Sequence, residues 1–376
     1  MSHPTVGIKS FVGVDLHKCT VTLAAVDAGG EILGRLTIST KSVQKIEDWL
    51  LGLPRPSQMA VEACPFVEWF IERYTPCVDR MEIADATQLA NLRGKRRKTD
   101  RNDSLDIACR LSRGECPLGY IADPTLMQFR KMGRHWRRLS QLLGGAKRAM
   151  KSMLNAANLH GPKFDGAGAQ RWLLAHGHLL HPVQRRAFGN YLDLLLLIER
   201  HRETLRREIL LAHRPEDFEK TENLLKTVPG IGDIWGLIIA AEIGPFERFP
   251  NADALEFWAG LTADLKASAG RTQSGNITKA GNATLRWALC QAAVTLCQCD
   301  ARQAAIRRRL IRRVGKARAN VAMGRRLLRT LYAMVRKNNP YCGGPRIDRT
   351  TRMNRAKTAR KRAKGSGKTK RPTQAA

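Results

Sequence analysis

The sequence predicts a mixed α/β domain followed by an all-α region, and three observations lead to this fold class. Between residues 10 and 110, short runs of β-forming residues alternate with helical patterns, as in a sheet flanked by helices. From residue 126 to 340 the apolar spacing is mostly helical, and the chain then ends in a basic stretch without apolar periodicity. We divide the sequence into an α/β domain at 1–120, a helical coiled-coil region at 121–218, a mostly helical domain at 219–340 and a disordered basic tail at 341–376.

The charge of the chain predicts a polyanionic partner. Its 65 Lys and Arg against 33 Asp and Glu give a formal net charge of +32, which favours nucleic acid far more than a membrane surface. No secretory signal and no apolar run of about 18 residues is present, so we expect a cytoplasmic, nucleoid-associated protein of a prokaryote with no membrane partner. The nine cysteines contain no CxxC pair and are expected to be reduced thiols rather than zinc ligands.

The first elements predicted are two strands that form a hairpin. Residues 11–26 alternate β-formers with polar residues, Gly29 and Gly30 supply a turn, and residues 31–39 follow as a second strand. Asp15 lies in the first strand among apolar neighbours, where a buried carboxylate is costly unless a cation satisfies it. Asp15 is therefore a candidate functional residue.

A second acidic residue, Glu62, repeats this pattern in the next predicted strand. That strand is SQMAVEA, at residues 57–63, and it follows a helix that two prolines end. The remaining elements predicted in this domain are helices at 42–53 and 65–74, a strand at 81–84, and a helix that begins near Asp100.

Residues 94–110, GKRRKTDRNDSLDIACR, combine basic and acidic residues in one short stretch. Asp100 and Asp103 are three residues apart at the start of a predicted helix, so both carboxylates share one helix face. Such a pair beside cationic residues suits a site where carboxylate-bound metal ions meet a polyanion. The alternative is a helix capped by Asp100, with Asp103 favoured by the helix dipole. The basic residues expected to contact phosphates here are Lys95, Arg96, Arg97, Lys98 and Arg101.

Together these acidic motifs resemble the DEDD motif of the RuvC-like domain in transposases of the IS110/IS1111 family. The motifs are GVDLHK with Asp15, AVEAC with Glu62, and KTDRNDSLDIA with Asp100 and Asp103. The resemblance implies an RNase H-like fold on which the four acids bind Mg²⁺. Two hard cations need several oxygen ligands, which carboxylates and a scissile phosphate supply. For Asp15 and Glu62 the alternative is a structural role as buried acids.

Two long helical patterns, at residues 126–159 and 182–213, predict a helical hairpin separated by the Gly-rich segment GPKFDGAGAQ. Arg134, Arg137 and Arg138 cluster on the first helix. We interpret them as nucleic-acid contacts on a surface that also meets a partner helix, and the alternative is a solvated helix face.

Residues 224–243 predict two helices joined by a PGIG turn, the helix-hairpin-helix arrangement. Gly230 and Gly232 lack a Cβ, so backbone N–H groups in such a turn can approach a phosphate closely. An ordinary turn between two helices is the alternative.

Residues 257–293 resemble the C-terminal transposase domain of the same family, most closely in GNITKAGNATLR. Members carry a Ser-Ser-Gly in the preceding loop, with one serine as the nucleophile, and the corresponding pair here is Ala267 and Ser268. Ser268 is therefore the candidate nucleophile, with Ser274 as the second candidate and a polar surface loop as the alternative. Lys279 and Arg286 suit phosphate contacts, although both could also be helix-end charges.

The resemblance covers nearly all of residues 8–340 and implies a DNA recombinase that uses Mg²⁺ and a serine nucleophile. It further implies donor and target DNA, a structured noncoding guide RNA, and a homo-dimer or tetramer. Two other functions remain open. One is a Holliday-junction-type nuclease that uses metal ions and water, and the other is a non-catalytic nucleic-acid-binding protein.

Overall fold

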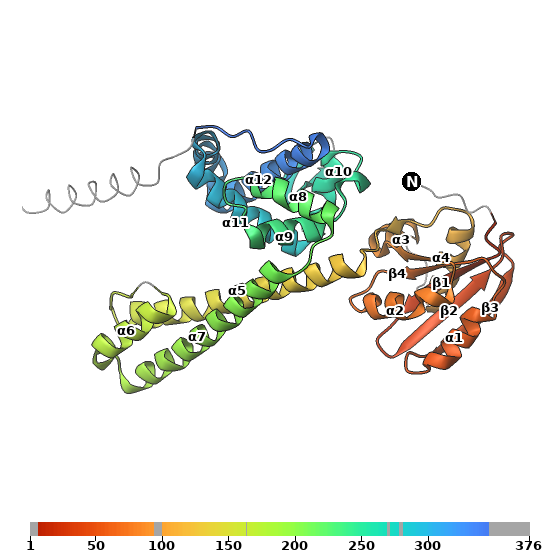
Figure 1. Cartoon of the computed structure of the whole chain (residues 1–376), viewed down its shortest axis with the longest axis horizontal. Coiled ribbons are helices and arrows are strands. Elements are labelled where there is room, and N and C mark those ends of the chain that lie inside the picture. The colour runs from red at the N-terminus through yellow and green to blue at the C-terminus, as the bar shows by residue number, and fades with distance from the viewer. Residues whose placement is uncertain (1–6, 94–99, 163, 269–270, 278–280, 346–376) are drawn as a thin grey trace, which may run out of the picture. The chain divides into compact units, whose positions relative to one another are not determined.

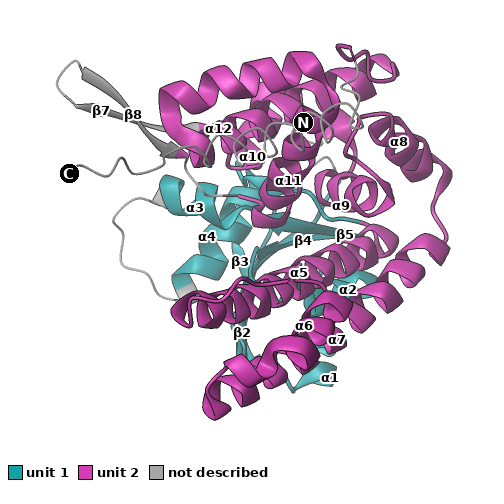
Figure 2. Cartoon of the chain, turned by 90° about the vertical axis from the view of Figure 1, so that its left-hand side faces the viewer, with its two compact units in different colours: residues 1–122 teal, residues 123–376 magenta. Residues whose placement is uncertain are grey.

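The computed structural model describes residues 7–93, 100–162, 164–268, 271–277 and 281–345, and the side chains of 93, 100, 101, 263–268 and 271–276 lie outside the described part. The chain divides into two compact units, Met1–Ala122 and Asp123–Ala376, which Figure 2 shows in different colours. The first unit is mixed α/β and the second is largely helical, as the sequence predicts at the level of fold class.

The first unit is built on a six-stranded sheet with the order β3-β2-β1-β4-β5-β6. β1 pairs antiparallel with β2 and parallel with β4, while β4 and β5 are also parallel. The hairpin prediction was wrong in one respect, because residues 11–26 form two strands joined by a three-residue turn at His17–Cys19, where His17 N–H donates to the Thr20 carbonyl oxygen. The strands are β1 (Ser10–Leu16), β2 (Thr20–Val26), β3 (Ile32–Ser39), β4 (Ser57–Glu62), β5 (Arg80–Ala84) and β6 (Leu118–Gly119).

Helices cover both faces of this sheet (Figure 1). α1 (Val43–Leu51) and α2 (Val67–Tyr74) share an apolar core with Val12 and Val14 of β1. α3 (Ala86–Arg93) and α4 (Asp100–Ser112) share the other core with Phe11. Successive side chains of a strand point to opposite faces, so β1 is buried on both sides and supplies alternate residues to the two cores.

The second unit begins with a helical arm (Figure 1). α5 (Pro124–Ala156) and α7 (Pro182–Leu211) pack side by side along it, as the predicted helical hairpin requires. α6 (Gly166–His176) lies between them in sequence and begins inside the Gly-rich segment that we expected only to separate two helices. The reason is Asp165, whose carboxylate accepts a hydrogen bond from Gly168 N–H at 2.7 Å and caps the new helix.

The rest of the second unit packs helices around α9 (Asp233–Ile243), which is buried from Gly236 to Ile243. α12 (Ala301–Lys337) contains one residue with non-helical backbone, Gly315 at φ +80°, where the helix is kinked. The other elements are α8 (Glu216–Lys226), α10 (Ala252–Trp258), β7 (Ala263–Ser268), β8 (Arg271–Ile277), α11 (Ala283–Cys299) and α12 (Ala301–Lys337), with 3₁₀ turns at Thr75–Cys77, Gly177–Leu179 and Phe246–Arg248.

Three glutamates are buried among the described residues of the second unit, and each is paired with arginine. Glu242 of α9 meets Arg134 of α5 at 3.0 Å and also accepts a hydrogen bond from the Asn282 side chain at 2.7 Å. Glu222 meets Arg214, and Glu256 meets both Arg325 and Arg329. A buried charge left without its partner costs about 3–5 kcal/mol. Some arginines of these helices therefore stabilise the fold.

The segment after α12 is fastened by Asp300, which lies buried between α11 and α12. Its carboxylate accepts hydrogen bonds from Gln303 N–H at 2.9 Å, from the Tyr341 hydroxyl at 2.9 Å and from Gly344 N–H at 2.8 Å. Burial alone would raise the pKa of Asp300, but these hydrogen bonds outweigh burial and lower the pKa below its ordinary value of 3.8.

The Asp300→Asn substitution is expected to lower the free energy of unfolding by about 2 kcal/mol at pH 7, because charge-assisted hydrogen bonds are lost. The native contribution is fully present above pH 3.8 and is lost as the pH falls through the lower folded-state pKa. Denaturant titrations at pH 7 and at pH 3 should therefore give a smaller difference between the two proteins at pH 3. An equal difference at both pH values would contradict this account.

Candidate catalytic and nucleic-acid-binding residues

Asp15 and Glu62 lie side by side at the carboxyl ends of two neighbouring parallel strands. β1 and β4 are paired with Gly13 opposite Ala60 and Val14 opposite Val61, so the next pair in register is Asp15 and Glu62. Paired residues of parallel strands point to the same face, and side chains two residues apart do so as well. Both carboxylates therefore lie on the face of the sheet that carries Gly13 and Ala60.

α4 covers this same face. A Cβ atom at Gly13 would lie only 2.0 Å from the carbonyl oxygen of Ser104 and 2.5 Å from the backbone nitrogen of Ala108. Glycine thus lets the backbones of β1 and α4 meet directly at this point. Asp103 immediately precedes Ser104, and Asp100 is the first residue of α4. The third and fourth acids of the motif therefore lie on the helix that packs against β1, the strand of Asp15.

The surroundings of Asp15 are polar and partly negative. Asp15 is buried, with a relative exposure of 8%, and its Oδ2 lies 3.4 Å from Nε2 of His17. Burial raises the pKa of the Cys64 thiol, and the charges of Asp15 and Glu62 raise it further, so both carboxylates act on the same small region. The sequence analysis did not single out His17, although GVDLHK places it two residues after Asp15 on the same side of an extended strand.

A hard divalent cation fits this donor set, because Mg²⁺ prefers carboxylate oxygens. Among the side chains that the structure describes, no three His, Cys, Asp or Glu groups gather closely enough to hold a metal ion. The side chain of Asp100 lies outside the described part, and so do Lys95, Arg96, Arg97, Lys98, the Arg101 side chain and Lys279. The four-acid site and the basic run beside it therefore stay predictions.

Ser268 and Ser274 lie on a β-hairpin, where a serine-containing loop was expected. β7 and β8 are antiparallel, with Ser268 opposite Arg271 at the end of the hairpin and Ser274 opposite Leu265 farther along. Ala269 and Gly270, which fall between the two strands in the sequence, lie outside the described residues. Ser268 is thus the last residue of β7, whereas Ser274 lies inside β8.

The basic residues proposed as phosphate contacts have different surroundings. Arg134 is bonded to buried Glu242, so its charge is already offset. Arg137 donates to the Thr284 hydroxyl at 3.2 Å, and Arg286 donates to the Ala259 carbonyl oxygen at 3.1 Å. Burial lowers the pKa of Arg286, and the positive charge of Arg137 lowers it further. Arg138 is exposed.

A further basic surface surrounds the kink in α12. Six residues there are exposed, and none of them forms an ion pair with any described residue. Helical spacing alone does not distinguish these residues from Arg325 and Arg329, which pair with Glu256. The exposed residues are Arg308, Arg309, Arg312, Arg313, Lys316 and Arg318.

The two glycines of the turn between α8 and α9 differ. Gly230 has φ +102°, and a Cβ atom there would lie 2.8 Å from the Thr295 Cβ of α11, so this glycine is needed for packing. A Cβ atom at Gly232, which precedes the first residue of α9, would have no described neighbour within 4 Å. Of the two, Gly232 has the open position that a close phosphate approach requires.

Comparisons with known proteins identify the class of protein that carries these features. Residues 222–308 match the family described as "Transposase IS116/IS110/IS902 family". A Pseudomonas aeruginosa protein described as "Probable family 20 transposase" is 25% identical over 344 residues, which cover 89% of this chain and 99% of the relative. The class is therefore that of the transposases. Both comparisons support the resemblance to IS110-family transposases that the motifs predict. None of the described helices is long and apolar enough to cross a membrane.

Proposed function

We propose that this transposase cuts and rejoins DNA with a carboxylate site on the sheet of the first unit and a serine from the β7–β8 hairpin. The observation that carries the proposal is the in-register placement of Asp15 and Glu62 on the face covered by α4, the helix of Asp100 and Asp103. We infer from this arrangement, together with the acidic motifs, that the first unit is a RuvC-like domain.

The residues that would hold Mg²⁺ are Asp15, Glu62, Asp100 and Asp103. When bound, the metal supplies a positive charge that stabilises the attacking and leaving oxygens of a phosphoryl transfer. The chain's own part is to hold the carboxylates in place: β1 and β4 fix two of them, and the close contact of α4 with Gly13 fixes the helix of the other two. Basic residues beside the site would position the DNA backbone.

We propose Ser268 as the nucleophile, because it is the last residue of β7, whereas Ser274 lies within β8. Its hydroxyl oxygen would form a bond to the scissile phosphorus, and the bond from phosphorus to one deoxyribose oxygen would break. The displaced strand would leave with a free hydroxyl and could reverse the reaction on a new phosphoserine. A phosphodiester is exchanged for a phosphodiester, so rejoining needs no external energy source.

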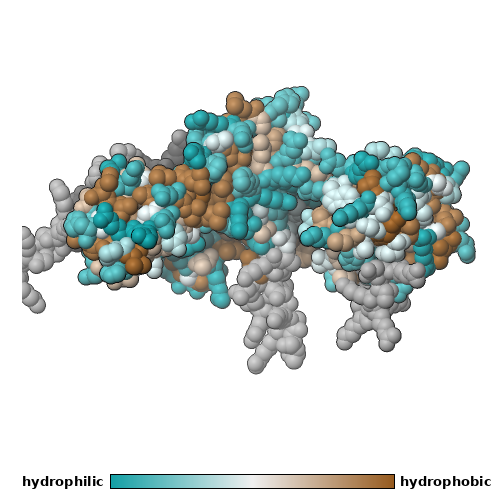
Figure 3. Space-filling view, turned by 90° about the horizontal axis from the view of Figure 1, so that it is seen from below, coloured by the Kyte–Doolittle hydropathy of each residue, from teal (hydrophilic) through white to brown (hydrophobic). Residues whose placement is uncertain are grey.

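The partners we propose are donor and target DNA, a structured noncoding guide RNA, and further copies of this chain. The exposed basic residues of α12 support a nucleic-acid partner. A homo-dimer or tetramer is supported by apolar side chains that the helical arm leaves exposed, and Figure 3 shows apolar surface in this region on its left-hand side. These residues are Leu174, Leu179, Val183, Leu194, Leu196, Leu197, Leu210 and Leu211.

A covalent protein–DNA adduct is the product that separates this function from its alternatives. Ser268→Ala is expected to abolish both the adduct and recombination while it changes stability by less than about 0.5 kcal/mol, because only one hydroxyl is lost. Denaturing gels with end-labelled DNA would measure the adduct, and Ser274→Ala is the matched control. If Ser274→Ala alone is inactive, the nucleophile is Ser274. If both variants remain active, a metal-dependent nuclease that uses water is the better explanation.

A further inference from the structure

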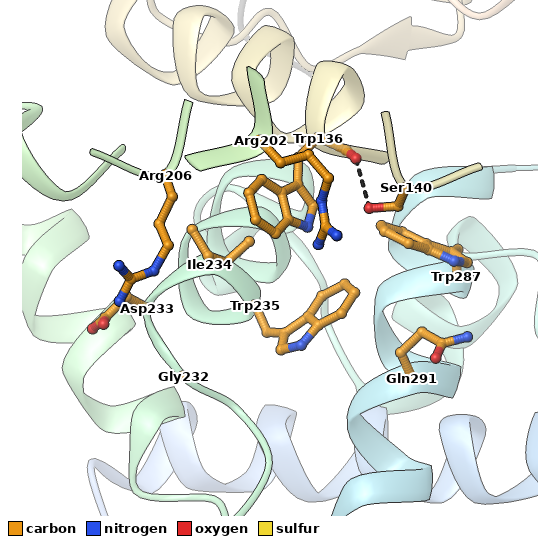
Figure 4. A pocket seen from close by; sticks show the side chains of 10 residues that line it. All are labelled: Trp136, Ser140, Arg202, Arg206, Gly232, Asp233, Ile234, Trp235, Trp287 and Gln291. Atoms are coloured by element: carbon orange, nitrogen blue, oxygen red, sulfur yellow. Dashed lines mark hydrogen bonds between the residues drawn. The ribbon is translucent and has the colours of Figure 1, made fainter. Parts of the chain in front are cut away.

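A second candidate site in the structure shares no lining residue with the acids or with the β7–β8 hairpin. It is a pocket of about 480 Å³ in the second unit, which we name the tryptophan pocket and which Figure 4 shows. Four segments distant in sequence form it: α5, α7, the start of α9, and α11. Its lining residues are Trp136, Ser140, Arg202, Arg206, Gly232, Asp233, Ile234, Trp235, Trp287 and Gln291.

Three of the seven tryptophans of the chain line this one pocket. Trp235 and Trp287 meet edge to face, with ring centroids 4.9 Å apart and an angle of 64° between the rings. Both rings are only partly buried, and both border the open space (Figure 4). Core packing alone would enclose such rings, and partly open, perpendicular aromatic rings offer a flat ligand two surfaces to contact.

The cationic side of the pocket is Arg202 of α7. Its Cζ atom lies 4.3 Å from the centre of the Trp136 ring, a stacked arrangement that fixes the guanidinium group. Its Nε is buried without a hydrogen-bond partner among the described residues. Burial lowers the pKa of Arg202, while the negative charge of Glu199 raises it. The guanidinium group nevertheless remains charged, as it does in proteins generally.

The other polar groups of the pocket lie near its rim. Arg206 is exposed, and Glu203 of the same helix lies 3.7 Å from it, a surface pair of little energetic weight. Asp233 is 3.4 Å from Nζ of Lys226, so its charge is offset. Gln291 is exposed and offers both a donor and an acceptor. The pocket is therefore aromatic inside and net cationic.

We propose that the tryptophan pocket binds one unpaired nucleobase of a nucleic-acid strand, held against the rings of Trp235 and Trp287. Arg202 donates to an acceptor atom on the base, and Arg206 lies beside the adjoining phosphate. A paired base inside a duplex cannot enter, because its faces and edges are occupied by its neighbours. The inference rests on the proposed function in that both need a nucleic-acid partner, but it does not depend on the acids or on Ser268.

Binding of short oligonucleotides in the presence of EDTA tests the pocket without catalysis. Trp287→Leu should weaken binding of a single-stranded oligonucleotide about tenfold, since stacking of one base on an aromatic ring is lost. Binding of a duplex of equal length should be unchanged, because no charge is removed. Trp69→Leu, at a partly exposed tryptophan of α2 in the first unit, is the matched control and should change neither. Equal weakening of single-strand and duplex binding, or no weakening of either, would overturn the proposal.

Further measurements make the result independent of the folding of one variant. Against an oligonucleotide of abasic sites, the difference between the native protein and Trp287→Leu should disappear. In the native protein, photocrosslinking of a 5-iodouracil oligonucleotide should mark the peptide of Trp235 or Trp287, and crosslinks confined to other peptides would contradict the proposal. Matched RNA and DNA oligonucleotides identify which strand supplies the base. If Trp287→Leu instead changes the oligomeric state and leaves oligonucleotide binding intact, the occupant is a second copy of this chain and the proposal fails.

Discussion

Asp15→Asn is expected to reduce Mg²⁺-dependent DNA cleavage by about 10³-fold or more while the protein stays folded. Asparagine keeps the shape of the side chain in its buried position but removes the charge that a hard cation requires. The loss of a ligand that holds a catalytic metal removes several kcal/mol of transition-state stabilisation, and each 1.36 kcal/mol is a factor of ten in rate. Single-turnover cleavage of labelled DNA over a range of Mg²⁺ concentrations would measure this effect.

The same variant has a readout that needs no DNA. A ligand that binds only the folded protein raises its stability, so Mg²⁺ should raise the melting temperature of the native protein and have little effect on Asp15→Asn. Asp48→Asn is the control, since Asp48 is exposed on α1, which covers the opposite face of the sheet. Normal cleavage by the Asp15→Asn protein would remove the four-acid site from the mechanism.

The sequence predicted the core of the first unit better than its edges. Val12 and Val14 face one core and Phe11 faces the other, so the alternation along β1 carried enough information to place Asp15 in a strand. The turn at His17–Cys19 was missed because its polar residues continue the alternating pattern across two strands. The register of β1 with β4, which places Asp15 beside Glu62, depends on contacts between segments more than 40 residues apart. No local sequence pattern therefore contains this register.

The roles of the arginines could not be read from the sequence for a similar reason. Arg134 and Arg138 are both basic residues of one helix, four positions apart. Arg134 pairs with Glu242, which is more than 100 residues away, whereas Arg138 forms no ion pair with any described residue. A buried glutamate in a long apolar stretch, such as Glu242 in LIIAAEI, was the available signal, because a carboxylate in a core needs a cation.

Gly13→Ala should be among the most damaging small substitutions in the first unit, with a loss of at least about 3 kcal/mol in the free energy of unfolding. The added Cβ would lie 2.0 Å from the Ser104 carbonyl oxygen and 2.5 Å from the Ala108 nitrogen, and both are backbone atoms of α4. Side chains can rotate out of an overpacked site, but a helix backbone has to move as a whole, and overpacking of a tight core typically costs about 1–3 kcal/mol or more.

The cost at Gly13 comes from packing alone, because its φ is not in the left-handed region. Gly34→Ala in β3 is the matched control: the nearest atom to its added Cβ is Cζ2 of Trp49 at 3.5 Å, an ordinary contact, so a change within about 0.5 kcal/mol is expected. Denaturant titrations would compare the free energies of unfolding of the two variants. Cleavage would then be measured on the folded fraction of the Gly13→Ala protein. If α4 shifts to admit the methyl group, Asp100 and Asp103 shift with it, and cleavage should fall even where the fold survives. If the Gly13→Ala protein keeps both native stability and native cleavage, α4 does not pack against β1 at this point. The placement of Asp103 near Asp15 would then also be wrong.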